Sequence, residues 1–308
     1  MIMNKVNVLM CVYKEEFNIV RQAVESITQQ TYNNIELIVV IDNPDRLDIV
    51  EFLDQSKTSY SIKYVLNEKN IGLTQSLNIG LQLCDASFVA RMDADDVAMP
   101  DRIENQMEFL LSNHCDLVGG YIQLIDENSC VIRNRTNYPV HDEAIKRMLL
   151  LKDCIPHPTW LFRREMAMKL QGYREVYAAE DYDFLIRAML AGAKFGVLPQ
   201  ICLQYRVNRR GITQNNLALQ KVLTGKIVDQ YRNRTIYTTL ELEEYVARNH
   251  KVLQKKEHFY HCVKKRKKKI VDLCDILFST TLLAEIRERV AERVLLAYDK
   301  CMQCYRWQ

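Results

Sequence analysis

Long hydrophobic runs are absent from this chain of 308 residues. No apolar stretch approaches the roughly 20 residues that a membrane-spanning helix needs. The chain enters an apparent strand at Val6, so a signal peptide is not expected. These absences predict a cytoplasmic protein, with peripheral attachment to the inner face of the cell membrane as a further option.

An excess of one charge is also absent. The chain has 42 basic and 39 acidic residues and a net charge of +3, which gives no general reason to expect a nucleic-acid partner. Its ten cysteines are scattered, and Cys11, Cys84 and Cys202 fall in apolar segments. Reduced thiols in the core of a cytosolic protein account for this pattern.

Strands and helices alternate regularly from residue 6 to about 125. Apolar runs predict strands at 6–12, 35–41, 62–66, 87–92 and 116–122. Apolar residues at spacings of three and four predict helices after the first, third and fourth of these strands. This order is typical of an α/β fold with a mainly parallel sheet, in which ligands bind beyond the carboxyl ends of the strands.

The remainder of the chain is less regular and then helical. Between about 126 and 212, the clearest prediction is a helix that begins at Glu180 and Asp181, followed by short strands at 195–198 and 201–206. From about 214 onward the pattern is helical, with almost no glycine or proline. We therefore predict two parts, an α/β domain at 1–213 and a helical appendage at 214–308.

A basic run interrupts the helical appendage. It consists of Lys264, Lys265, Arg266, Lys267, Lys268 and Lys269. Such a run is usually a solvated helix face. Because apolar residues such as Val263 and Ile270 flank it, it could instead contact an anionic membrane surface. A third option is that the appendage forms a homo-oligomer.

Three carboxylates lie within four residues, at Asp93, Asp95 and Asp96, directly after the fourth predicted strand. They repel one another unless a cation joins them, and Mg²⁺ or Mn²⁺ is commonly held by a few carboxylates together with substrate phosphates. An isolated Asp-x-Asp would more often be an acidic turn before the helix predicted to begin near Pro100. Asp42 also ends a predicted strand, which favours a ligand site at this edge.

Several ordered motifs resemble those of bacterial glycosyltransferases of family 2, which have the nucleotide-sugar-binding GT-A fold. The resemblance covers roughly residues 5–215. Its motifs are Val-Tyr-Lys-Glu-Glu at 12–16, the Asp42 turn, Asn-Ile-Gly-Leu-Thr-Gln-Ser-Leu-Asn-Ile-Gly at 70–80, Arg-Met-Asp-Ala-Asp-Asp at 91–96, Pro-Asp-Arg-Ile-Glu at 100–104, and Ala-Glu-Asp-Tyr-Asp-Phe-Leu at 179–185 with Arg187.

The resemblance implies an inverting transfer of a sugar from a UDP-sugar to a saccharide acceptor, often lipid-linked, in the synthesis of a surface polysaccharide. It assigns metal binding to Asp95 and Asp93, and the role of general base to Asp181. The donor contacts that it implies are Tyr13, Glu15, Asp42, Asn70, Arg91 and Asp93, with Asp42 bonded to the uracil ring.

Four residues keep an alternative interpretation. Arg91 could form a salt bridge to Asp96 or Glu104 instead of contacting ribose or phosphate. Asp181 could cap its helix. Arg187 could pair with Asp183 or position Asp181. His157, which prolines flank, more often packs in its loop than contacts an acceptor.

The chain departs from the family pattern at two places. The segment 41–44 reads Ile-Asp-Asn-Pro where many relatives have Asp-Asp-Gly-Ser. After Tyr205 and Arg206 the chain lacks a histidine that relatives often use near metal or pyrophosphate.

Two other functions compete with glycosyl transfer. A sugar nucleotidyltransferase would need a glycine-rich loop after the first strand, and residues 12–17 contain no glycine. A non-catalytic partner subunit would not need to keep Asp93, Asp95 and Asp181.

Overall fold

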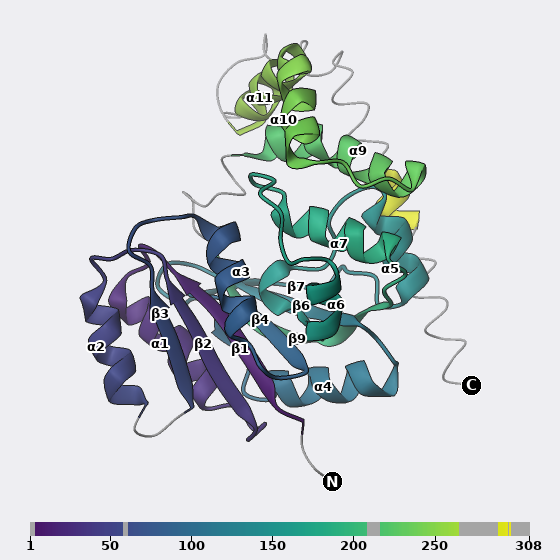
Figure 1. The fold of residues 1–308 in the computed structure, drawn as a ribbon. Coiled ribbons are helices and arrows are strands. Elements are labelled where there is room, and N and C mark those ends of the chain that lie inside the picture. Colours follow the sequence, from purple (N-terminus) through teal and green to yellow (C-terminus); the bar gives the residue numbers. More distant parts are fainter. Residues whose placement is uncertain (1–3, 58–60, 208–215, 265–288, 295, 297–308) are drawn as a thin grey trace.

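Four apolar runs form a parallel half-sheet, as the sequence predicts. The strands are β1 (Val6–Val12), β2 (Ile35–Ile41), β3 (Ile62–Leu66) and β4 (Phe88–Asp93), in the spatial order β3-β2-β1-β4. The computed structural model describes residues 4–57, 61–207, 216–264, 289–294 and 296. Helices cover both faces of these strands (Figure 1), which is why the strands are nearly continuous runs of Val, Ile and Leu.

The register of the parallel strands brings their carboxyl ends to one edge. Val12 lies opposite Ile41, and Cys11 lies opposite Asp93. The residues that follow β1 and β2 therefore emerge beside the end of β4. This edge carries the candidate site.

The second half of the sheet is mixed. Its strands are β5 (Val97–Ala98), β6 (Leu117–Ile125), β7 (Val131–Arg135), β8 (Leu161–Arg163) and β9 (Phe195–Arg206). β8 runs antiparallel between β4 and β6, whereas β9 runs parallel to β6. The two short strands predicted at 195–198 and 201–206 are one strand, β9. Its pairing with β6 shifts register around Pro199, which cannot donate a ladder hydrogen bond.

The helices of the first half pack closely on the sheet. They are α1 (Phe17–Thr28), α2 (Leu47–Ser56), α3 (Leu73–Leu83) and α4 (Arg102–Ser112). Gly80 lets α3 approach β1, because a Cβ atom there would lie 2.1 Å from Leu9 Cδ1. The prediction that Pro100 lies in the first helical turn is wrong, since α4 begins at Arg102 with Asp101 as its N-cap residue.

Shorter helices support the second half of the sheet. They are α5 (Asp142–Leu149), the 3₁₀ turn η1 (His157–Thr159), α6 (Arg164–Lys169) and α7 (Glu180–Leu190). Every residue of α7 from Tyr182 to Met189 is buried. The N-terminus of α7, which carries Glu180 and Asp181, is therefore held rigidly by packing.

The predicted C-terminal helices are present as α9 (Leu217–Asn233), α10 (Thr239–Arg248) and α11 (His250–Lys264). α9 packs against α7, and buried Leu223, Ile227 and Leu242 belong to the same hydrophobic cluster as the sheet. The predicted boundary at 213/214 and residues 265–269 of the basic run lie outside the described residues. No helix in the described part is both long and apolar enough to cross a membrane.

Candidate active site

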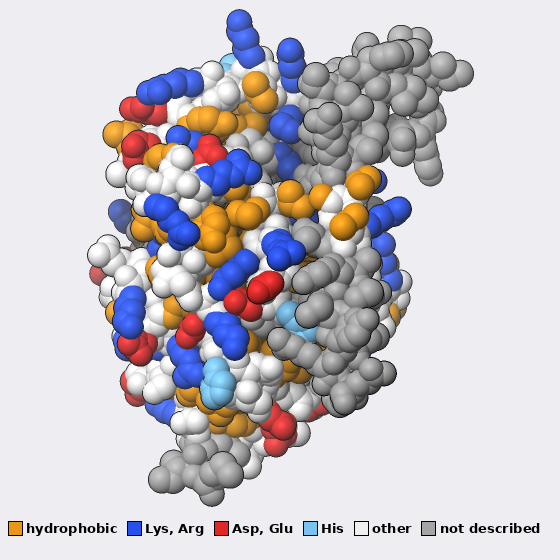
Figure 2. Space-filling model, turned by 90° about the vertical axis from the view of Figure 1, so that its right-hand side faces the viewer, with side chains coloured by type: hydrophobic (Ala, Val, Ile, Leu, Met, Phe, Trp, Pro, Cys, Tyr) orange, Lys and Arg blue, Asp and Glu red, His pale blue; other side chains and the backbone are white. Residues whose placement is uncertain are grey.

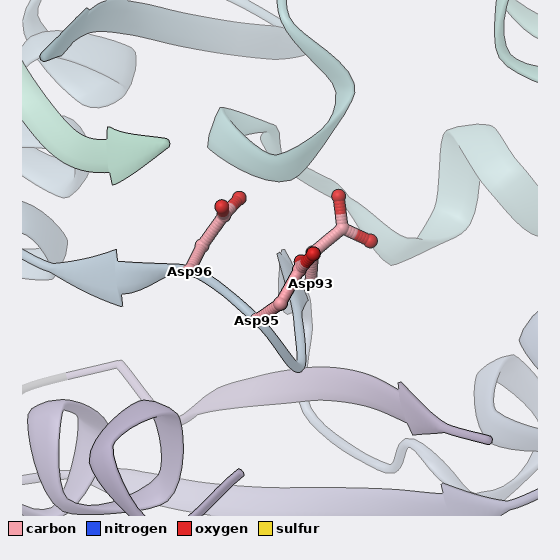
Figure 3. Close-up of side chains that lie close together, drawn as sticks. All are labelled: Asp93, Asp95 and Asp96. Atoms are coloured by element: carbon pink, nitrogen blue, oxygen red, sulfur yellow. The ribbon is translucent and has the colours of Figure 1, made fainter. Parts of the chain in front are cut away.

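Three carboxylates meet at the end of β4. Asp93 is the last residue of β4, and Asp95 and Asp96 form the turn before β5. One oxygen from each carboxylate lies within 4.8 Å of the others. Figure 3 shows that the three side chains extend to the same side of the turn. This spacing lets one small cation contact all three.

The raised pKa values of the carboxyl groups in the acidic turn indicate a site for a cation. Burial, together with the charges of Asp93 and Glu15, raises the pKa of Asp95 to about 7. Burial also raises the pKa of Asp96, which is 1% exposed and whose Oδ2 has no hydrogen-bond partner among the described residues. A divalent cation would give this buried oxygen a partner and remove the repulsion. The residues present therefore fit a Mg²⁺ or Mn²⁺ ion.

Arg206 at the end of β9 holds the turn in shape, a role that the sequence did not reveal. Its backbone N–H donates to Asp96 Oδ1 at 2.8 Å, and its Nε donates to the Asp95 carbonyl at 2.8 Å. Its Nη1 also donates to the Asp126 carbonyl at 3.0 Å. The side chain is buried, so these bonds lie in a low-dielectric setting.

Arg91 lies beneath the acidic turn and is 3% exposed. Its Nη2 is 2.5 Å from Asp93 Oδ1, so the predicted alternative of a salt bridge to Asp96 or Glu104 is wrong. The backbone carbonyl of Arg91 accepts a hydrogen bond from Arg102 Nη2 at 2.7 Å. The Nε and Nη1 groups of Arg91 have no hydrogen-bond partner within the described chain. Because both nitrogens are buried, the guanidinium acts on Asp95 through its charge.

The loop after β1 places Tyr13 and Glu15 near the acidic turn. The Tyr13 N–H donates to the Glu15 carboxylate at 2.7 Å, and the charge of that carboxylate acts on Asp95. Arg46, which the motifs did not single out, donates to the Glu15 carbonyl at 2.8 Å. The Tyr13 side chain is 42% exposed, so its ring is accessible for stacking.

Asp42 organises the loop before α3. Its carboxylate accepts hydrogen bonds from the N–H groups of Ile71 at 2.9 Å and Gly72 at 2.8 Å, and from the Asn67 side chain at 2.9 Å. Gly72 has φ = +88°, a conformation that favours glycine. Asp42 is 4% exposed, whereas Asn70 in the same loop is exposed. Three protein donors thus bind the Asp42 carboxylate. The contact of Asp42 with uracil remains a prediction.

Asp181 lies in the first turn of α7. Burial is the main cause that raises its pKa, and the negative charge of Asp93 adds to it. Burial and the charge of Asp181 raise the pKa of Glu180 to about 7. Asp181 Oδ1 also accepts a bond from the N–H of Tyr182 at 2.7 Å. Asp181 thus satisfies one donor of the helix N-terminus and lies within the field of the acidic turn.

Arg187 pairs with Asp183 rather than with Asp181. Its Nε donates to Asp183 Oδ2 at 2.8 Å, and Arg174 donates to both oxygens of the same carboxylate. Gln230 of α9 contacts Asp183 at 3.2 Å and Arg174 at 2.8 Å. This network joins α7 to the C-terminal helix α9.

His157 packs inside the protein, as its more frequent interpretation predicts. It is buried, its Nε2 lies 2.9 Å from the Tyr173 hydroxyl, and its ring lies edge-on against Trp160. Burial, with the charge of Arg91, lowers its pKa well below the ordinary value. His157 is therefore neutral at physiological pH.

Comparisons with known proteins agree with the fold and with the motifs. The family model for glycosyl transferase family 2 matches residues 7–171. The chain is 31% identical over 238 residues to the O-antigen biosynthesis glycosyltransferase WbnJ of Escherichia coli, covering 76% of this chain and 92% of that protein. It is 25% identical over 209 residues to an Escherichia coli UDP-Gal:alpha-D-GlcNAc-diphosphoundecaprenol beta-1,3-galactosyltransferase, covering 67% and 75%.

A solved structure has the same fold. The crystal structure of S. aureus TarS 1–349 in complex with UDP-GlcNAc superimposes with a TM-score of 0.61 at 15% identity, covering 96% of this chain and 87% of that one. The α/β architecture with its mostly parallel sheet is therefore GT-A, as the sequence predicts. Together with the family match, this places the chain in glycosyl transferase family 2, and the protein is a glycosyltransferase.

Proposed function

We propose that this enzyme transfers a sugar from a UDP-sugar to a saccharide acceptor, with inversion and with the help of Mn²⁺ or Mg²⁺, in the synthesis of a surface polysaccharide. The observation that carries the proposal is the acidic turn: three carboxylates within 4.8 Å of one another, one with a buried oxygen that lacks a partner. The names of WbnJ and of the galactosyltransferase, and the UDP-GlcNAc bound to TarS, support the donor and the pathway class.

The proposed ion would be held by Asp95 and Asp93, and Asp96 lies close enough to join them. When bound, such an ion would draw charge from the departing diphosphate. Arg91 orients the Asp93 carboxylate through its 2.5 Å contact. Its buried guanidinium would add positive charge near the same edge of the sheet.

Asp181 would accept the proton of the attacking acceptor hydroxyl. Its carboxylate is fixed by the Tyr182 N–H and by the buried body of α7. A raised pKa increases the proton affinity of a carboxylate, and a base works best when its pKa approaches the operating pH. One displacement at the anomeric carbon, with base and leaving group on opposite sides, inverts that centre.

Tyr13, Glu15 and Asn70 would contact the base and ribose of the donor. Tyr13 and Asn70 are exposed around the edge where β1 and β2 end. In this proposal Asp42 acts on the nucleotide chiefly through the loop that it shapes.

A donor screen tests the proposal. Release of the nucleoside diphosphate is measured from a panel of nucleotide sugars, with Mn²⁺ and with EDTA. We expect turnover with at least one UDP-sugar, and we expect UDP to raise the melting temperature only when Mn²⁺ is present. Full activity in EDTA would contradict the metal assignment. A protein that neither binds UDP nor turns over any donor would instead be a non-catalytic subunit.

Attachment to the cytoplasmic membrane surface is the second part of the proposal, because the acceptor is expected to be lipid-linked. Each Lys or Arg near an anionic surface contributes about 1 kcal/mol. Changing all six residues of the basic run to Gln should release the protein from anionic vesicles at low salt and leave UDP binding unchanged. Wild-type protein that ignores such vesicles would favour oligomerisation as the role of the appendage.

A further inference from the structure

A cavity of about 160 Å³ opens between β7 and the end of α5. Its lining comes from β7, from the segment that follows β7, from the turn after α5, and from Glu292. The lining residues that matter for the argument are Arg133, Arg135, Tyr138, Lys152, Asp153 and Glu292. Figure 2 shows the side of the molecule on which α5 and α7 lie in Figure 1, where basic and acidic side chains gather among apolar ones.

The cavity carries two arginines whose charges are not paired. Arg133 and Arg135 are two residues apart on β7 and therefore lie on the same face of the strand. Lys152 already pairs with Glu292 at 2.5 Å, whereas neither arginine has an ion pair among the described residues. The Arg135 guanidinium lies over the Tyr138 ring, 5.3 Å from its centroid. Burial, with the charge of Asp181, raises the pKa of Asp153 to about 8.

The cavity lies next to the proposed general base. The charges of Asp181 and Arg135 both act on Asp153 in its wall, in opposite directions. The hydroxyl of Tyr182, the residue after Asp181, donates to the Leu149 carbonyl at the end of α5. The turn after α5, which supplies Lys152 and Asp153 to the cavity wall, is therefore joined to the first turn of α7.

We propose that this cavity is the acceptor subsite and that Arg133 and Arg135 select a saccharide that carries an anionic group, either a phosphate or a carboxylate. Residues two apart on a strand are about 7 Å apart, so both guanidinium groups can reach one such group. Arginine binds carboxylate and phosphate in the same bidentate way. This inference rests on the proposed function, because it names the acceptor class of that same site.

The test measures binding of small anionic sugars by saturation-transfer NMR, with the donor site filled by UDP and diamagnetic Mg²⁺. The probes are N-acetylglucosamine 1-phosphate, glucuronate and, as the neutral control, N-acetylglucosamine. The protein variants are wild type, the double variant Arg133→Gln with Arg135→Gln, and the control Arg21→Gln. Arg21 is a half-exposed arginine of α1 that does not line the cavity.

We expect wild type and Arg21→Gln to bind at least one anionic probe, and the double variant to bind it at least about ten-fold more weakly, which corresponds to 1.4 kcal/mol. The probe that binds identifies the source of the anion. Both arginines are exposed, so the double variant should keep the wild-type melting temperature. Equal anion binding by the double variant, or no anion binding by wild type, would overturn the inference. UDP binding is recorded on the same samples, and its failure would count against the proposed function instead.

Discussion

Replacing Asp183 with Asn should destabilise this enzyme strongly. Asp183 is fully buried and accepts hydrogen bonds from Arg187, Arg174 and Gln230. Burial alone would raise the pKa of Asp183, but the bonds from Arg174 and the charge of Arg187 outweigh it and leave the pKa below its ordinary value. Asn keeps the shape and removes the charge, so Arg187, which is 2% exposed, would retain a buried charge without its counter-ion.

The expected loss of stability follows from the cost of removing one partner of a buried ion pair. Such a change typically costs about 3–5 kcal/mol, against a total stability of about 5–15 kcal/mol. Burial also lowers the pKa of Arg187, which opposes the pair, but arginine keeps its charge in proteins. Adding Arg187→Met to Asp183→Asn should recover part of the loss, because no unpaired charge then remains on Arg187.

The assay is urea unfolding followed by circular dichroism at several pH values. Because the folded pKa is lowered, the contribution of Asp183 is present above the unfolded pKa of about 4 and disappears as pH falls through the folded pKa. The variant should lose that part of the pH dependence. Asp229→Asn is the matched control, since its 3.4 Å pair with Arg232 is exposed and should be worth less than about 1 kcal/mol. A loss for Asp183→Asn as small as that of the control would refute the reasoning.

Three further predictions concern the site. Asp95→Ala should abolish donor turnover and the Mn²⁺ requirement of UDP binding; undiminished turnover would show that Asp95 is not a ligand. Affinity for Mn²⁺ with UDP, measured by calorimetry, should fall as pH drops through about 7, because protons then occupy Asp95. Glu15→Gln should move that midpoint to lower pH, and an unchanged midpoint would contradict the charge effect. Asp181→Asn should keep UDP-sugar binding and lose transfer by about 10²–10⁴-fold in a product-release assay, and wild-type turnover would leave Asp181 with only its helix-terminal role.

The parallel half of the fold was predictable because its strands are continuous apolar runs. β1, β2 and β3 have the predicted bounds. The structure adds α2, α5, β5, β7 and β8, which the sequence did not predict. β8 has only three residues, and β7 is exposed along its whole length, so neither shows a clear hydrophobic period. Their positions depend on pairing with distant strands.

The candidate site was predictable only where the chemistry lies within one motif. Asp93 and Asp95 were proposed from a local pattern, and Asp181 from the family resemblance. Arg206 and Asp153 were not, because their roles arise from contacts with residues remote in sequence. Arg206 reaches Asp96 across 110 residues, and Asp153 acquires its raised pKa from burial and from Asp181. No local pattern distinguishes such residues from ordinary surface charges.

The hydrogen bonds from Arg206 to the acidic turn also have a consequence for the order of folding. β1 to β4 come from the first 93 residues and can pair as soon as they are synthesised. The acidic turn, however, receives its hydrogen bonds only when the end of β9 reaches it. Such distant contacts form late, because a long loop must close first. The parallel half-sheet β1 to β4 can therefore assemble before the acidic turn receives the hydrogen bonds that hold its shape.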